Sequence, residues 1–179
     1  MDSIINFFKF CQTEFKYGWM DKNYNYHERV NDALTYSLQT PEELIKSKIG
    51  ICWDMTELYR EYFKKKTNLK YETYYIFYED NLGCQNHSIL VFYANNKVYW
   101  FEPMFQDKKC YYSGIHEYDN LKELLKDFKT IWVKFALVNK MIPENYNKNN
   151  IFIYKYDIPK YHINGIEMRN HINNSEFIF

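Results

Sequence analysis

The chain has 179 residues, and its 23 basic and 23 acidic side chains give a formal net charge of zero. This balance provides no electrostatic attraction to nucleic acid or to an anionic membrane, so we expect neither as a partner. Hydrophobic residues make up 46% of the chain and aromatic residues 21%, a composition that argues against disorder and favours sheet-rich packing.

Helical patterns come first along the chain. Residues 2–17 carry apolar side chains at helical spacing. A short second helix is predicted to begin at Pro41, with Thr40 as its N-cap. Gly50 then provides a flexible turn, and a third helix is predicted from Cys52 to about Lys65.

The third predicted helix is amphipathic. Glu57, Glu61 and Lys64 lie on one side of it. The opposite side carries an apolar stripe at the i, i+3, i+4 spacing that helices bury, consisting of Met55, Leu58, Tyr59, Tyr62 and Phe63.

Strands are predicted in the middle of the chain. Tyr71–Glu79 is rich in aromatic and β-branched residues. His87–Tyr93 and Val98–Glu102 flank a short polar stretch whose Asn95 and Asn96 suit a two-residue hairpin turn, because asparagine tolerates positive φ.

The last part of the chain is predicted to contain a helix followed by strands. Asp119 is expected to cap a helix over Asn120–Phe128, followed by strands over Ile131–Val138 and Ile151–Tyr156. The asparagine-rich stretch Glu144–Asn150 is a loop candidate. Helices followed by a mostly antiparallel sheet indicate an α+β fold, in one domain spanning residues 1–179 with a C-terminal tail over 151–179.

Membrane and secretion signals are lacking in this sequence. No stretch approaches the ~18 uninterrupted apolar residues of a membrane-spanning helix. The N-terminus lacks the basic start and cleavage site of a signal peptide. The cysteines, Cys11, Cys52, Cys84 and Cys110, form no C-x-x-C pair. We therefore expect a cytoplasmic protein with reduced thiols and without a metal or cofactor.

The hairpin register predicts one specific contact. A two-residue turn at Asn95 and Asn96 pairs Val91 with Trp100 and places His87 and Glu102 on the same face as diagonal neighbours. Such neighbours lie roughly 7–8 Å apart at the backbone, within reach of a glutamate side chain. A carboxylate bonded to one ring nitrogen orients an imidazole so that the other nitrogen can act as a base.

Cys52 supplies a complementary group. The first turn of a helix carries partial positive charge and free N–H groups, which favour a thiolate and can hold an oxyanion, with the Cys52 amide as the first donor. Gly50 leaves room for close approach, and Asp54 lies in the same turn.

Each of these residues also has a structural interpretation. Taken alone, Cys52 fits a buried thiol, His87 a satisfied core or surface histidine, and Glu102 an edge charge that limits aggregation. The three in this order form a more specific pattern, because a cysteine at a helix start with a histidine and an acid on paired strands is an arrangement of thiol catalysis.

This pattern resembles the transglutaminase-like superfamily of papain-fold enzymes. The matching stretches are "GICWDMTELYREYF" and "NHSILVFYANNKVYWFEP". The resemblance implies a papain-like core over about 41–138, with Cys52 as the nucleophile, His87 as general base and acid, and Glu102 as the residue that orients His87. The third member is usually aspartate in the family, and glutamate in some related bacterial proteins.

The resemblance leaves parts of the site open. Asp54 and Asp107 are the substitutes for Glu102 if the register differs. No side-chain oxyanion donor matches the family pattern, and Gln85 and Asn86 are the nearest candidates in sequence. A zinc site from Cys84, His87 and Cys110 follows no known spacing.

The function that follows is acyl transfer through a thioester on Cys52, from a protein or peptide substrate or from a small amide. Water as the second acceptor gives a protease or amidase, and an amine gives an acyltransferase. The alternatives are a non-catalytic binding module on the same fold and a metal-dependent hydrolase.

Overall fold

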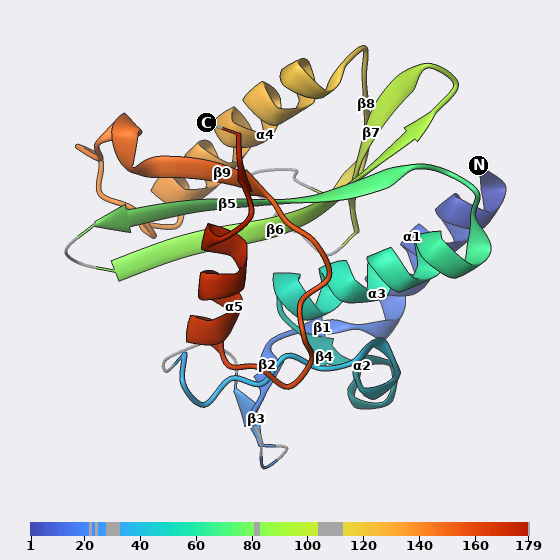
Figure 1. Cartoon of the computed structure of the whole chain (residues 1–179), viewed down its shortest axis with the longest axis horizontal. Coiled ribbons are helices and arrows are strands. Elements are labelled where there is room, and N and C mark those ends of the chain that lie inside the picture. Colours follow the sequence, from blue (N-terminus) through green and yellow to red (C-terminus); the bar gives the residue numbers. More distant parts are fainter. Residues whose placement is uncertain (22, 24, 28–32, 81–82, 104–112, 179) are drawn as a thin grey trace.

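The structure is a computed structural model that describes residues 1–179 except 22, 24, 28–32, 81–82, 104–112 and 179 (Figure 1). Its helices are α1 (Asp2–Glu14), α2 (Pro41–Ser47), α3 (Cys52–Lys66), α4 (Leu121–Val138) and α5 (Gly165–Asn173). Its strands are β1 (Lys16–Tyr17), β2 (Trp19–Met20), β3 (Tyr26–His27), β4 (Ile49–Gly50), β5 (Tyr71–Asp80), β6 (Gly83–Ala94), β7 (Lys97–Glu102), β8 (Gly114–Tyr118), β9 (Ile151–Lys155) and β10 (Glu176–Phe177).

An antiparallel sheet organises the molecule. Within the described residues it has six strands in the order β10-β9-β5-β6-β7-β8, and each neighbouring pair runs antiparallel. Short pairs form beside it, β1 with β4 in parallel and β2 with β3 antiparallel. The predicted α+β fold with a mostly antiparallel sheet is confirmed. In the described part of the chain, no helix is both long and apolar enough to cross a membrane.

Helices cover both faces of the sheet, with α4 on one side and α1, α3 and α5 on the other (Figure 1). Trp100 and Ile89 pack against Phe128 and Trp132 of α4 in one hydrophobic cluster. On the opposite face, the side chains of α1 and α3 form a second cluster with β6 and β7. A third cluster joins the start of α3 to β5 and α5.

The hairpin between β6 and β7 has the predicted register. Asn95 and Asn96 have φ angles of 50° and 60°, the left-handed conformations that a tight two-residue turn needs. Val91 pairs with Trp100, as the two-residue turn requires. The ladder ends where Leu90 pairs with Phe101.

The predicted starts of α2 and α3 are confirmed. Thr40 caps α2 through the backbone N–H of Glu43, whose carboxylate in turn accepts from the Thr40 N–H. Helix α3 begins at Cys52 and buries its apolar stripe except for Tyr62, which is half-buried. Glu57, on the other side of α3, is also buried and forms an ion pair with Arg60.

Several predicted elements are wrong. Residues 131–138 are the second half of α4, although they read as a strand, and the cap of α4 is Asn120 rather than Asp119. The first helix ends at Glu14, and Lys16–Tyr17 forms strand β1. Gly50, predicted as a flexible turn, pairs with Tyr17 in strand β4.

The C-terminal residues are part of this architecture. Strand β9, predicted over Ile151–Tyr156, lies between β5 and β10 in the sheet. Helix α5 buries Met168 and Ile172 in the cluster that contains the start of α3. Residues 151–179 therefore contribute both a strand and a helix to the core.

Candidate active site

His87 and Glu102 form a buried pair. The Nε2 atom of His87 lies 2.6 Å from Oε2 of Glu102, and the two residues are only 2% and 3% exposed. Both lie just beyond the last pair of the β6–β7 ladder, where they remain diagonal neighbours on one face. The contact predicted from the turn is thus present.

The electrostatic surroundings of His87 favour the imidazolium. Burial by itself lowers the pKa of His87, because it disfavours the charged ring. The negative charge of Glu102 and hydrogen bonds with Cys52 and Glu102 outweigh that effect and raise the pKa to about 9. The buried carboxylate and the buried ring therefore compensate each other's desolvation.

Cys52 is brought to the same imidazole. It is the first residue of α3 and is 6% exposed. Its side chain forms a hydrogen bond with His87. Because Glu102 binds Nε2, the other ring nitrogen, Nδ1, is the one that can face the sulfur. The structure thus brings Cys52, His87 and Glu102 together in the order that the sequence suggested.

Asp54 does not take the role of a substitute for Glu102. Its carboxylate accepts hydrogen bonds from the backbone N–H of Ile51 and Gln39, both at 3.0 Å, and from the hydroxyl of Tyr36 at 2.9 Å. Burial raises the pKa of Asp54 to about 6, although these hydrogen bonds act in the other direction. Asp54 therefore ties the residue before Cys52 to the segment around Gln39.

Tyr17 is a contact of Cys52 that the sequence did not reveal. Its oxygen accepts a hydrogen bond from the Cys52 backbone N–H, and its hydroxyl donates to the Cys52 sulfur. Burial of the hydroxyl, with the neighbouring Cys52, raises the pKa of Tyr17 well above its usual value. The residue as a whole is 47% exposed, so the ring reaches solvent while its oxygen lies against the thiol.

No sequence signal could have found Tyr17. It reaches Cys52 because β1 pairs with β4, which places Tyr17 beside Gly50. A two-residue strand carries no periodic pattern, and its partner lies far away in the sequence. The contact depends on tertiary pairing alone.

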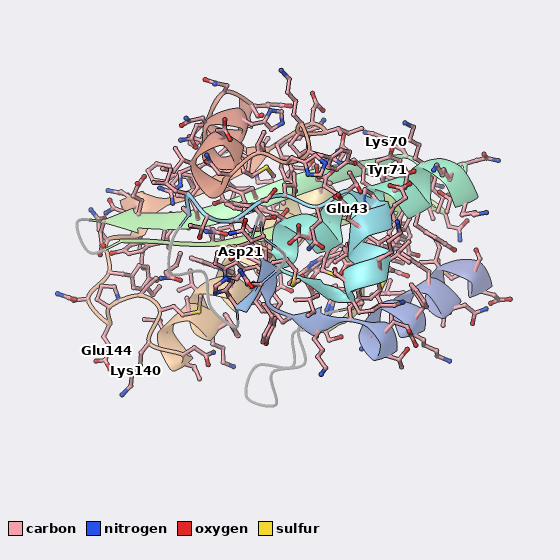
Figure 2. All side chains as sticks on the ribbon, turned by 90° about the horizontal axis from the view of Figure 1, so that it is seen from below. Asp21, Glu43, Lys70, Tyr71, Lys140 and Glu144 are labelled. Atoms are coloured by element: carbon pink, nitrogen blue, oxygen red, sulfur yellow. The ribbon has the colours of Figure 1, made fainter. Side chains whose placement is uncertain are left out.

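The two oxyanion candidates, Gln85 and Asn86, lie in β6 just before His87. Gln85 lines a cavity of about 660 Å³ together with Lys140 and Glu144. Lys140 and Glu144 lie at the opposite end of the molecule from Lys70 and Tyr71, which follow α3 (Figure 2). Asn86 precedes His87 in β6, so its side chain points to the other face.

The structure describes only some of the residues considered for a zinc site or as substitutes for Glu102. Asp107 and Cys110 lie outside the described residues, as does the side chain of Cys84. Within the residues that are described, no cluster of histidine, cysteine and acidic side chains could hold a metal ion.

Comparison with protein families identifies the fold. Residues 1–136 match the transglutaminase-like domain. The chain belongs to the transglutaminase-like family. Comparison with curated proteins gives no match. The transglutaminase-like match includes Cys52, His87 and Glu102 and ends within α4, so β9, α5 and β10 lie outside it.

The segment beyond the transglutaminase-like match also supports the region of the site. The Tyr156 hydroxyl hydrogen-bonds the hydroxyl of Ser88, the neighbour of His87, and its carbonyl accepts from Thr73 at 2.6 Å. Arg60 donates to Thr73 at 2.7 Å, and its guanidinium lies 5.3 Å from the Tyr156 ring centre. This buried polar network joins α3, β5 and β6 to the end of β9.

Proposed function

We propose that this transglutaminase-like protein is a cysteine enzyme that acts on an amide or ester carbonyl through a thioester on Cys52. The observation that supports it best is the shared imidazole: Glu102 holds one side of the His87 ring at 2.6 Å, and the Cys52 thiol hydrogen-bonds the same ring. A thiol, an imidazole and an orienting carboxylate are the parts that thiol acyl transfer requires.

The first half of the reaction follows from these positions. The sulfur of Cys52, with its proton held on the His87 ring, forms a bond to the carbonyl carbon. The carbonyl oxygen becomes an oxyanion that can accept a hydrogen bond from the Cys52 backbone N–H. Collapse re-forms the carbonyl and breaks the bond to the leaving amine or alcohol, which takes its proton from His87.

The second half releases the acyl group. His87 removes a proton from water or from an amine, whose oxygen or nitrogen attacks the thioester carbon. The bond to sulfur breaks, the proton stays on His87 beside the sulfur, and an acid or a new amide leaves. Glu102 stabilises the imidazolium in both halves and holds the orientation of the ring.

The proposal covers two outcomes that differ in the acceptor. Water gives a protease or amidase, and an amine gives an acyltransferase. The expected partner is a protein or peptide, or a small amide with its amine acceptor. The proposed chemistry uses groups of the protein itself and needs no cofactor. A reducing cytoplasm would keep the Cys52 thiol available.

Acylation of intact protein tests this proposal. The protein is mixed with p-nitrophenyl acetate near neutral pH, and the adduct is located by mass spectrometry. We expect one acetyl group on Cys52, with the rate lost in Cys52→Ala and lowered about 10²-fold or more in His87→Ala. Cys11→Ala is the matched control, because burial raises the pKa of that thiol well above its usual value and suppresses its reactivity.

A second candidate function follows from the burial of the site. Cys52 is 6% exposed, as a thiol in a non-catalytic binding module on the same fold would also be. In that case Cys52 reacts no faster than Cys11, and His87→Ala changes nothing. Such a result would remove the enzyme proposal and leave the binding module.

A further inference from the structure

The position of the Tyr17 oxygen carries information about the reaction. It accepts the Cys52 backbone N–H and lies beside the Cys52 sulfur. When a thiol at a helix start attacks a carbonyl, the carbonyl oxygen must lie next to the sulfur and within about 3 Å of that same N–H. The tyrosine oxygen therefore occupies the place that a substrate oxygen would need.

We propose that Tyr17 is the side-chain donor of the oxyanion site, and that its hydroxyl fills this site itself until a substrate carbonyl oxygen takes its place. This inference rests on the proposed acyl transfer at Cys52, and it supplies the donor that no family motif provides.

The backbone fixes Tyr17 at this position. The N–H of Lys16 donates to the Lys48 carbonyl at 2.9 Å, and the N–H of Gly18 donates to the Gly50 carbonyl at 3.3 Å. A side chain at Gly18 would come within 2.6 Å of the Tyr26 ring, so only glycine permits this close packing. The strand therefore holds the backbone of Tyr17 beside the start of α3 by two hydrogen bonds.

The side chain of Tyr17 is nevertheless able to move. The residue as a whole is 47% exposed although its hydroxyl is buried, so a small rotation of the ring disturbs little of the core. A carbonyl oxygen can then accept the hydrogen bond from the N–H of Cys52. The tyrosine hydroxyl moves only a short distance and can still donate a hydrogen bond to that oxygen. The fixed backbone and the exposed ring together allow a short displacement rather than a large opening.

The movement of charge during the reaction favours donation from Tyr17. In the resting state its hydroxyl donates to the Cys52 sulfur. As the sulfur bonds to the carbonyl carbon, the negative charge moves from sulfur to oxygen. The same O–H can follow that charge to the oxyanion without any transfer of its proton, so the residue leaves the reaction unchanged.

Two other donors near the start of α3 already have partners. The Tyr36 hydroxyl donates to Asp54, and the Gln39 side-chain amide donates to the Ile49 carbonyl at 2.8 Å. The side chains of His87 and Tyr17 both hydrogen-bond the Cys52 thiol. His87 has its role as acid and base, and Tyr17 is the side chain that contacts both the Cys52 sulfur and the Cys52 backbone N–H.

Two reactions of the Cys52 thiol distinguish an oxyanion donor from a side chain that only shields the thiol. Alkylation by iodoacetamide is a displacement at carbon that forms no oxyanion, whereas acylation by p-nitrophenyl acetate forms one. Both rates are measured at Cys52 by intact mass for the wild type, Tyr17→Phe and Tyr26→Phe. Tyr26 is the matched control because it is a nearby tyrosine with the same 47% exposure.

We expect Tyr17→Phe to lower the acylation rate about 10²-fold or more relative to the alkylation rate, the usual effect of removing one oxyanion donor. Tyr26→Phe should leave the ratio of the two rates unchanged. If the ratio of the two rates is unchanged in Tyr17→Phe, whatever the change in each rate, the role of Tyr17 is overturned. The proposed function is unaffected by that result. A wild-type protein that is alkylated but never acylated at Cys52 would overturn the proposed function, and this inference with it.

Discussion

A buried imidazole bonded to a buried carboxylate is an ion pair in surroundings of low polarity. For His87 the folded state raises the pKa from 6.5 to about 9, chiefly because the attraction of Glu102 and the hydrogen bonds outweigh burial. A raised histidine pKa stabilises the folded protein fully below the unfolded pKa of about 6.5, and this stabilisation is lost as the pH rises through the folded value. The pair thus contributes stability and sets the charge of the ring at neutral pH.

Glu102→Gln should lower the pKa of His87. The amide can still accept a hydrogen bond, but the negative charge that favours the imidazolium is gone, so we expect a decrease of about one unit or more. NMR titration of the His87 ring measures it directly. Glu117→Gln, on the exposed side of β8, is the control and should leave the titration unchanged. An unaltered His87 titration in Glu102→Gln would show that the carboxylate does not set the charge of the ring.

Asp54 shows the opposite balance between burial and hydrogen bonding. Its pKa is raised from 3.8 to about 6, so the folded state binds more protons than the unfolded state between these values. The free energy of unfolding therefore falls as the pH rises through this window. Ionised Asp54 costs stability, yet it is the acceptor that fixes the backbone before Cys52.

Asp54→Asn removes this titration. Between about pH 3 and pH 7, the free energy of unfolding of the wild type should fall relative to that of the variant by about 3 kcal/mol in total, and the difference should be constant above that range. Urea unfolding of both proteins across the range measures it, with the exposed Asp157→Asn as control. Parallel curves for wild type and Asp54→Asn would mean that Asp54 does not titrate in this window.

At the scale of elements, the β6–β7 hairpin decides whether His87 meets Glu102. A slip of one residue would turn every side chain of a strand to the other face. The turn prevents this because Asn95 and Asn96 both take positive φ, which only a few residue types tolerate.

Asn96→Gly should therefore stabilise the protein. Glycine reaches positive φ without the steric cost that asparagine retains, so we expect the free energy of unfolding to rise by about 0.5–1 kcal/mol. Chemical denaturation measures the change. Lys97→Gly, one residue later in β7, is the control and should cost a similar amount, because glycine weakens a strand. A loss of stability in Asn96→Gly would contradict the role given to the turn.

Helix α4 includes residues for which local sequence patterns predicted the wrong secondary structure. Residues 131–138 combine aromatic and β-branched side chains, which favour a strand when they are read locally. The packing shows helical spacing instead, because the buried positions continue the period of the first half of the helix. These positions are Leu124, Leu125, Phe128, Trp132, Phe135 and Ala136. Contact with the sheet outweighed local propensity.

At the scale of the whole molecule, the C-terminal residues stand next to the site although they lie outside the family match. Figure 1 places α5 beside the N-terminal end of α3, below the sheet. Met168 and Ile172 share a hydrophobic cluster with Cys52 and Trp53. We therefore expect residues 151–179 to unfold together with the core rather than as a separate tail.

Met168→Ala tests this expectation. The side chain is fully buried, and its truncation should lower the free energy of unfolding by about 2–5 kcal/mol. The loss should appear in one transition that tryptophan fluorescence and far-UV circular dichroism report at the same denaturant concentration. Asn170→Ala, on the exposed side of α5, should have little effect. Separate transitions for the two probes would instead indicate a C-terminal unit that melts by itself.

Local sequence patterns were enough to predict the start of α3 at Cys52, the turn at Asn95 and Asn96, and through that turn the contact of His87 with Glu102. These features depend on interactions between residues close in the chain, for which local rules of capping, turn chemistry and strand alternation are sufficient. Three other features became visible only in the folded molecule: Tyr17 lies on the thiol, Asp54 anchors the backbone instead of orienting His87, and β9 joins the sheet. Such contacts join distant segments, and they are selected by the packing of the whole molecule, which no local pattern records.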